Sequence, residues 1–235
     1  MFLDISTLVF AAGVGAGAGL VIHGLVRARR LRKLGFTTRE MVSKEDFYRK
    51  LAKITVEKLP QEVSFKPIDS HAWSKDSEYA RASAALEGLG FERQSVFLAS
   101  PQKWVVEIWL SKNDGLFAAI LDCSPGGVHT EVVVEYKDGS TVSFENTSEC
   151  GQQHLKNYNW IHCGSITPDK LLHRALQDRR PDHIGHMQLA DCLRAYERAV
   201  NENLSWRRRI GYTPDEIKRL HERARRARSL LTKLS

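Results

Sequence analysis

The hydrophobic pattern of this chain begins with a run that contains no charge. No Asp, Glu, Lys or Arg lies between Ile5 and Val26, and a basic cluster follows at once, made of Arg27, Arg29, Arg30, Arg32 and Lys33. A helix of about twenty uncharged residues is long enough to cross a bilayer. The pattern therefore predicts a single transmembrane helix, and residues 1–34 are expected to form a membrane anchor with a basic flank.

The basic cluster also predicts the orientation of this helix. Short Lys/Arg-rich flanks stay on the cytoplasmic side of a membrane. The N-terminus is therefore expected outside the cytoplasmic (inner) membrane and the C-terminal domain in the cytosol, with the five basic side chains at the anionic membrane surface. A secretory signal peptide is the alternative, but its positive charges would precede the apolar run instead of following it.

Small residues alternate within the predicted span. Gly13, Gly15, Gly17 and Gly19 form two overlapping GxxxG patterns. Because small residues let helix backbones approach closely in lipid, this face predicts packing against another membrane helix, either of a partner protein or of a second copy. The alternative is a weakly hydrophobic anchor that packs against no other helix.

A helical period follows the anchor. Phe47, Leu51 and Ile54 recur at spacings of four and three residues, and Ser43 is placed to cap the start of the helix. The residues that come after this helix show little periodicity. Residues 35–75 are therefore expected to form a juxtamembrane helix and a connector.

Alternation of apolar and polar positions dominates the middle of the chain. Five strand-like segments are separated by short turns: residues 91–100, 103–111, 116–123, 130–137 and 141–146. Because connections this short cannot cross over, the strands are expected to form an antiparallel β-meander. Trp104 and Trp109 fall on opposite faces of the second strand, so both faces need cover, which helices at 77–87 and 167–178 supply. The pattern predicts an α+β sheet domain over residues 76–181.

Four segments of this region occur in the same order in a known group of domains: residues 84–91, 116–120, 134–141 and 167–172. They contain a Leu-Gly-Phe sequence before the first strand and a Tyr-x-Asp-Gly hairpin near the end of the sheet. In these motifs the chain resembles an uncharacterised bacterial family of membrane-anchored α+β domains of unknown function. The resemblance implies the fold and the limits of the domain, and it brings no catalytic residues.

Residues 182–235 return to a helical period. One helix is expected from about 183 to 208, and Thr213 to Glu216 form a capping box for a second helix. The second helix carries a narrow apolar seam at alternating spacings of three and four: Ile217, Leu220, Ala224, Ala227, Leu231 and Leu234. The two helices are expected to form a hairpin. The seam either closes on the first helix or binds a helix of a partner protein.

Charge is distributed unevenly along the chain. The net charge is +7, yet residues 59–181 contain twelve basic and sixteen acidic side chains, so the middle is mildly acidic and both flanks are basic. Basic flanks beside an anchor suit an anionic leaflet, whereas a nucleic-acid-binding protein more often has a basic body. Nucleic acid is therefore not expected as a partner.

Residues with catalytic or metal-binding potential are few. Cys150, His154, His162 and Cys163 come nearest to a metal site, but their spacing differs from that of zinc-ligand pairs. The chain contains no GxSxG, HExxH or phosphate-loop motif. No enzyme activity, cofactor or metal is therefore expected.

These patterns favour a single-span membrane protein with a cytoplasmic interaction or scaffold domain, such as a subunit of a membrane complex. The alternative is a sheet domain that binds a small apolar ligand, with Trp104, Trp109 and Phe117 lining the site. A hydrolase or a metal enzyme is less favoured. A sheet whose interior is filled by its own side chains would exclude the apolar ligand.

Overall fold

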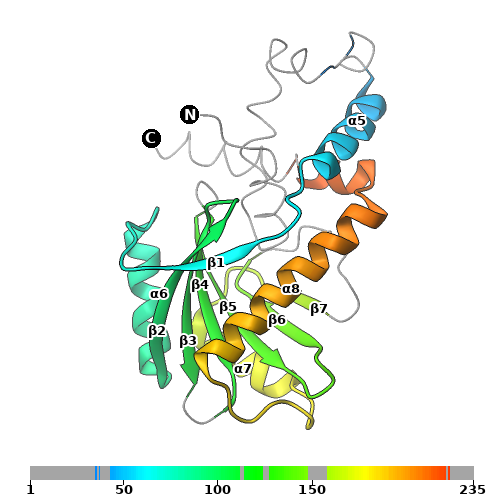
Figure 1. The fold of residues 1–235 in the computed structure, drawn as a ribbon. Helices are drawn as coiled ribbons and strands as arrows, with labels where there is room; N and C mark the ends of the chain where they lie inside the picture. Colours follow the sequence, from blue (N-terminus) through cyan, green and yellow to red (C-terminus); the bar gives the residue numbers. More distant parts are fainter. Residues whose placement is uncertain are drawn as a thin grey trace.

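The structure is a computed structural model, and it describes residues 43–111, 114–123, 127–147 and 158–220, together with positions 35, 37 and 222. These residues form an α+β fold (Figure 1). Its helices are α5 (Lys44–Glu57), α6 (Asp76–Gly88), α7 (Pro168–Asp178) and α8 (Leu189–Ile210). Its strands are β1 (Ser64–Ile68), β2 (Phe91–Ser100), β3 (Val105–Ser111), β4 (Phe117–Asp122), β5 (Val128–Glu135), β6 (Thr141–Glu145) and β7 (Tyr158–His162).

A single seven-stranded sheet organises these elements, and its strands lie side by side in chain order. Every neighbouring pair from β1 to β6 is antiparallel, as the alternation and the short turns predict. The last strand, β7, is parallel to β6. The α+β class and the antiparallel pairing of the five predicted strands are confirmed, whereas the expected number of about five strands is wrong, because the sheet has two more.

The two strands that the pattern missed are the edge strands. Pro67 lies in β1, and proline lacks the N–H that an interior strand would need, so it argued against a strand at this position. Strand β7 is only five residues long and shows no alternation in burial. Residues 146–157, between β6 and β7, are numerous enough for the crossover that a parallel pair requires.

Helices α6 and α7 cover one face of the sheet. Their buried side chains Leu86 and Leu171 pack against apolar residues of the central strands, among them Trp109, Ile120 and Val134. Pro168 occupies the first turn of α7, where its missing N–H is not needed. Both covering helices were predicted within one or two residues.

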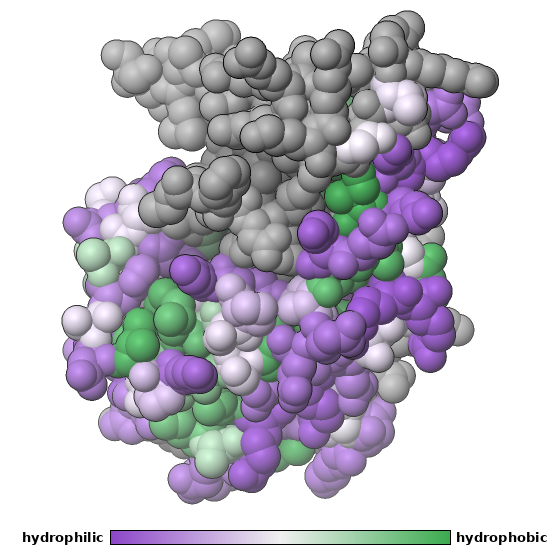
Figure 2. All heavy atoms as spheres, turned by 45° about the horizontal axis from the view of Figure 1, so that its top comes forward, coloured by the Kyte–Doolittle hydropathy of each residue, from purple (hydrophilic) through white to green (hydrophobic). Residues whose placement is uncertain are grey.

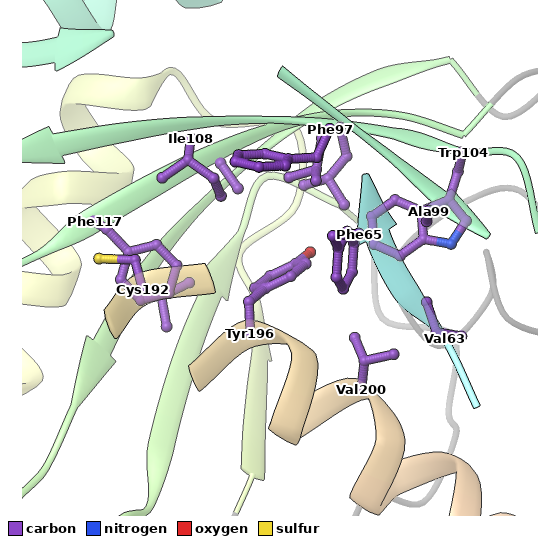
Figure 3. Close-up of a cluster of buried hydrophobic side chains, with 14 of the residues drawn as sticks. Val63, Phe65, Phe97, Ala99, Trp104, Ile108, Phe117, Cys192, Tyr196 and Val200 are labelled. Carbon is purple, nitrogen blue, oxygen red and sulfur yellow. The ribbon is translucent and has the colours of Figure 1, made fainter. Parts of the chain in front are cut away.

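Helix α8 covers the opposite face. Figure 3 shows Tyr196 and Val200 pointing from α8 toward Phe65 of β1 and Phe97 of β2. The ring of Tyr196 makes edge contacts with Phe65 and Phe117, with centroids 5.6 and 6.4 Å apart. Both faces of the sheet are therefore packed with side chains.

Helix α5 and the end of α8 form a helical end of the molecule, away from the β5–β6 hairpin (Figure 1). The Ser43 hydroxyl accepts a hydrogen bond from the Asp46 N–H at 3.3 Å, which confirms the predicted cap. After Gly211, residues 214–220 are helical again, and Thr213 and Glu216 form the predicted capping box. The C-terminal helix thus begins where the sequence indicated.

Among the residues that the structure describes, no helix is both long enough and apolar enough to cross a membrane. The predicted span, residues 5–26, lies outside the described residues. The transmembrane helix therefore stays a prediction.

Candidate functional site

Most residues of the predicted helix-packing, membrane-surface and partner sites lie outside the described residues. These are Gly13, Gly15, Gly17, Gly19, Arg27, Arg29, Arg30, Arg32, Lys33, Ala224, Ala227, Leu231 and Leu234. Two residues of the predicted seam are described, and both are buried: Ile217 is 0% exposed and Leu220 is 3% exposed. In this structure their side chains are buried at the helical end, so they are not accessible to a partner protein.

The helical end brings together the points where two strongly basic segments join the folded body. The first segment, residues 27–33, precedes α5, and the second, residues 223–235, follows the helical residues 214–220. Each segment contains five basic and no acidic side chains. Although these segments are far apart in sequence, α5 contacts α8, and residues 214–220 follow directly from α8 (Figure 1). Folding therefore places both attachment points at one end of the molecule.

The described surface of this end is itself polar and partly basic. Exposed basic side chains come from α5 and its C-cap, from the last turn of α8 and from the residues after it: Lys53, Lys58, Arg209, Lys218 and Arg219. Ile210, at the end of α8, is the exposed large hydrophobic residue of the described chain, at 47%. Figure 2 shows that the described surface on this side is mostly hydrophilic, with smaller hydrophobic areas between the polar ones.

A buried ion pair holds the helical end together. The Arg207 guanidinium donates to the Glu216 carboxylate at 3.0 Å, and the two side chains are 3% and 2% exposed. Arg207 also lies over the rings of Trp206 and Tyr212, 4.7 and 4.4 Å from their centroids. The sequence predicted the capping role of Glu216, but nothing in the pattern indicated Arg207 as its buried partner.

The aromatic residues that were expected to line an apolar ligand site do not share a cavity. Trp104 and Phe117 belong to the core beneath α8, and Trp109 belongs to the core beneath α6 and α7. All three are at most 3% exposed. Trp104 and Phe117 lie in a packed core, which disfavours an apolar ligand between them, whereas Trp109 also borders a cleft beside α6.

A row of buried polar side chains crosses β5, β6 and β7 on the α8 side of the sheet. Glu131 lies opposite Glu145, and Glu145 lies opposite His162. The Tyr196 hydroxyl donates to Glu131 at 3.3 Å, and the Thr147 hydroxyl donates to Glu145 at 2.9 Å. Both carboxyl groups are completely or almost completely buried.

The pKa values of the two carboxyl groups in this row are shifted in opposite directions. Burial, the charge of Glu145 and a hydrogen bond between the two groups raise the pKa of Glu131 well above its ordinary value. Burial opposes ionisation of Glu145 too, but the hydrogen bond and the charge of His162 outweigh it and lower the pKa of Glu145. Among the described residues, the Oε1 atoms of both side chains have no hydrogen-bond partner. A proton on Glu131, donated toward the Glu145 carboxylate, accounts for this arrangement.

With that proton the pair is a carboxylic acid beside a carboxylate, and the Tyr196 hydroxyl connects it to α8. The sequence analysis singled out neither carboxyl group. The sequence shows charged residues in two neighbouring strands, but it does not give the register that places them opposite each other.

The weak metal-site candidate is divided between the two faces of the sheet. His162 contacts Glu145 with Nδ1 3.3 Å from the carboxylate, whereas Cys163 packs on the α6 and α7 side. Cys150 and His154 lie outside the described residues. Within the described part of the chain, no three His, Cys, Asp or Glu side chains are arranged to hold a metal ion.

Comparisons of the chain with protein-family models, with curated proteins and with solved structures found no match. Membership of the uncharacterised bacterial family therefore stays a prediction.

Proposed function

We propose that this chain is a single-span membrane protein whose cytosolic α+β body serves as an interaction or scaffold module, as a subunit of a membrane complex. The observation that carries the proposal is that the described residues nearest in sequence to both basic segments, α5 and residues 214–220, lie at one end of the body. This end would face the anionic leaflet, and the rest of the body would be held at a fixed distance from it.

The charge pattern supports an orientation of this kind. A basic residue near the anionic leaflet contributes about 1 kcal/mol of attraction, and ten such residues lie in the two segments. The buried Arg207–Glu216 pair joins α8 to the helical residues that precede the second segment. In the proposal, the two segments act on the same membrane surface.

Packing of the sheet supports a module that works through its surface. The side chains on both faces of the sheet are used for internal contacts with α6, α7 and α8. A partner protein would therefore be bound by exposed residues, by the predicted span or by the basic C-terminal segment.

The test is recovery of a stoichiometric partner with the full chain from membranes in mild detergent. Two variants address the two proposed contacts: Gly15→Leu with Gly19→Leu in the span, and Arg223, Arg225, Arg226 and Arg228→Gln in the C-terminal segment. At least one of them is expected to lower partner recovery several-fold, because it removes close helix approach or charge attraction.

A matched control neutralises basic residues away from the helical end, namely Lys66, Arg81, Lys137 and Lys170, which are all exposed. This control should leave partner recovery unchanged. A wild-type chain that purifies without any partner, or variants that keep every partner in full, would contradict the proposal.

A further inference from the structure

A second polar cluster lies on the opposite side of the molecule from α8, around a carboxylate inside the sheet. Glu107 of β3 is 0% exposed, and both of its oxygens are used. Oε1 accepts from Arg93 Nε at 2.5 Å and from the Tyr79 hydroxyl at 3.3 Å. Oε2 accepts from Trp109 Nε1 at 2.9 Å. The carboxylate thus fixes three side chains from α6, β2 and β3.

Within the described residues, the Arg93 guanidinium donates a hydrogen bond through one nitrogen, Nε. Its side chain is 53% exposed, and within the described residues nothing accepts a hydrogen bond from Nη1 or Nη2. The hydrogen bond to Glu107 raises the pKa of Arg93, so the guanidinium stays charged. A fixed guanidinium with two unused nitrogens is preorganised to bind a planar anion in a bidentate manner.

These groups border a cleft of about 590 Å³ between α6 and the start of β2. One stripe of α6 forms a wall through Tyr79, Ser83 and Glu87, which recur every four residues. Residues 90–94 and Trp109 form the other side. The volume is within the range of small-molecule sites.

We infer that this cleft binds a small organic molecule with a single carboxylate, which pairs with Nη1 and Nη2 of Arg93. The uncharged remainder of the molecule would lie along Tyr79 and Phe91. This site is independent of the proposed membrane function, because it uses none of the residues of the helical end.

Acidic residues at the cleft define the class of ligand further. Glu87 and Glu92 also border it, and both are exposed. Their charges repel a polyanion, such as a phosphorylated compound or a nucleic acid, more strongly than a monocarboxylate. The site is therefore selective for a single negative charge.

The experiment uses the full chain in detergent micelles and ligand-observed NMR. Acetate and 3-phenylpropionate are the carboxylate probes, 3-phenylpropionamide is the uncharged analogue, and inorganic pyrophosphate is the polyanion. At least one carboxylate should bind with a dissociation constant below ~10 mM, and 3-phenylpropionamide and pyrophosphate should bind at least about tenfold more weakly. Tighter binding of pyrophosphate, or equal binding of the amide, would overturn the inference, as would no binding of either carboxylate.

Variants connect the binding to Arg93. Arg93→Gln should abolish carboxylate binding, and Arg93→Lys should weaken it because the ammonium group cannot form the two-nitrogen contact. Glu87→Gln should tighten binding about two- to threefold by removing repulsion, an effect that a purely structural role of the cleft would not produce. If Arg93→Gln does not fold, the carboxylate affinities of Arg93→Lys and Glu87→Gln test the assignment. Unchanged affinity in these two variants would contradict the assignment.

Discussion

At the scale of single residues, the buried carboxyl group of Glu131 gives the stability of the protein a pH dependence. The pKa of Glu131 is raised from its ordinary 4.5. Between pH 4.5 and the raised pKa, the folded protein therefore holds a proton that the unfolded chain has released. The contribution of Glu131 to the free energy of unfolding is complete below pH 4.5 and is lost as the pH rises through the raised pKa.

Glu131→Gln is expected to remove the loss of stability that occurs as the pH rises. Gln keeps a donor toward Glu145 but cannot ionise, so the variant should be about 1–3 kcal/mol more stable than the wild type at pH 8 and nearly equal to it at pH 4. The measurement is denaturant unfolding of the full chain in detergent from pH 4 to pH 8. Glu62→Gln, at an exposed position before β1, is the control and should follow the wild-type profile. Parallel profiles for Glu131→Gln and the wild type would show that Glu131 is ionised in the folded state.

At the scale of secondary-structure elements, the elements best predicted from sequence were those with caps, tight turns or regular alternation. Helices α6 and α7 and strands β2 to β6 were predicted at nearly the observed positions, because each is bounded by glycine, proline or Asx turn residues. The start of α8 was placed too early, since residues 183–188 are not helical and contain a single bridge between His183 and Tyr136. Helical periodicity alone does not locate a helix start that lacks a Ser, Thr, Asp or Asn cap.

The polar contacts inside the elements were not predictable from the pattern. Glu107 stands within an apolar strand, and its partners Arg93 and Tyr79 come from other elements. Glu131 and Glu145 face one another only because the β5–β6 register places them so. These contacts depend on which strands pair and in which register. A single sequence shows the alternation along a strand but does not show its register.

The attachment of the C-terminal helix to α8 depends on the Arg207–Glu216 pair. Arg207→Ala would leave the Glu216 carboxylate buried without its cation, which costs about 3–5 kcal/mol. The double variant Arg207→Met with Glu216→Leu should lose much less, because no unpaired charge remains buried. Thermal unfolding of the full chain measures both. A double variant less stable than Arg207→Ala would show that the net attraction of the pair exceeds its desolvation cost.

At the scale of the whole molecule, the helical end is the side of the body that the proposal turns toward the membrane. It contains α5 and residues 214–220, and in the sequence one strongly basic segment precedes α5 and the other follows residue 222. The α6 cleft and the sheet's α7 cover belong to other parts of the body. An anchored chain would therefore hold the cleft away from the bilayer and open to small molecules of the cytosol.

The most direct test of the proposed membrane orientation is lipid-headgroup quenching of a fluorescent amino acid in the full chain, reconstituted in nanodiscs. Lys218, at the helical end, and Lys170, on α7, are both exposed and serve as matched label positions. The proposal predicts strong quenching at 218, weak quenching at 170, and a larger difference in anionic than in zwitterionic lipid. Equal quenching at the two positions, or a chain that does not remain with the nanodiscs, would contradict it.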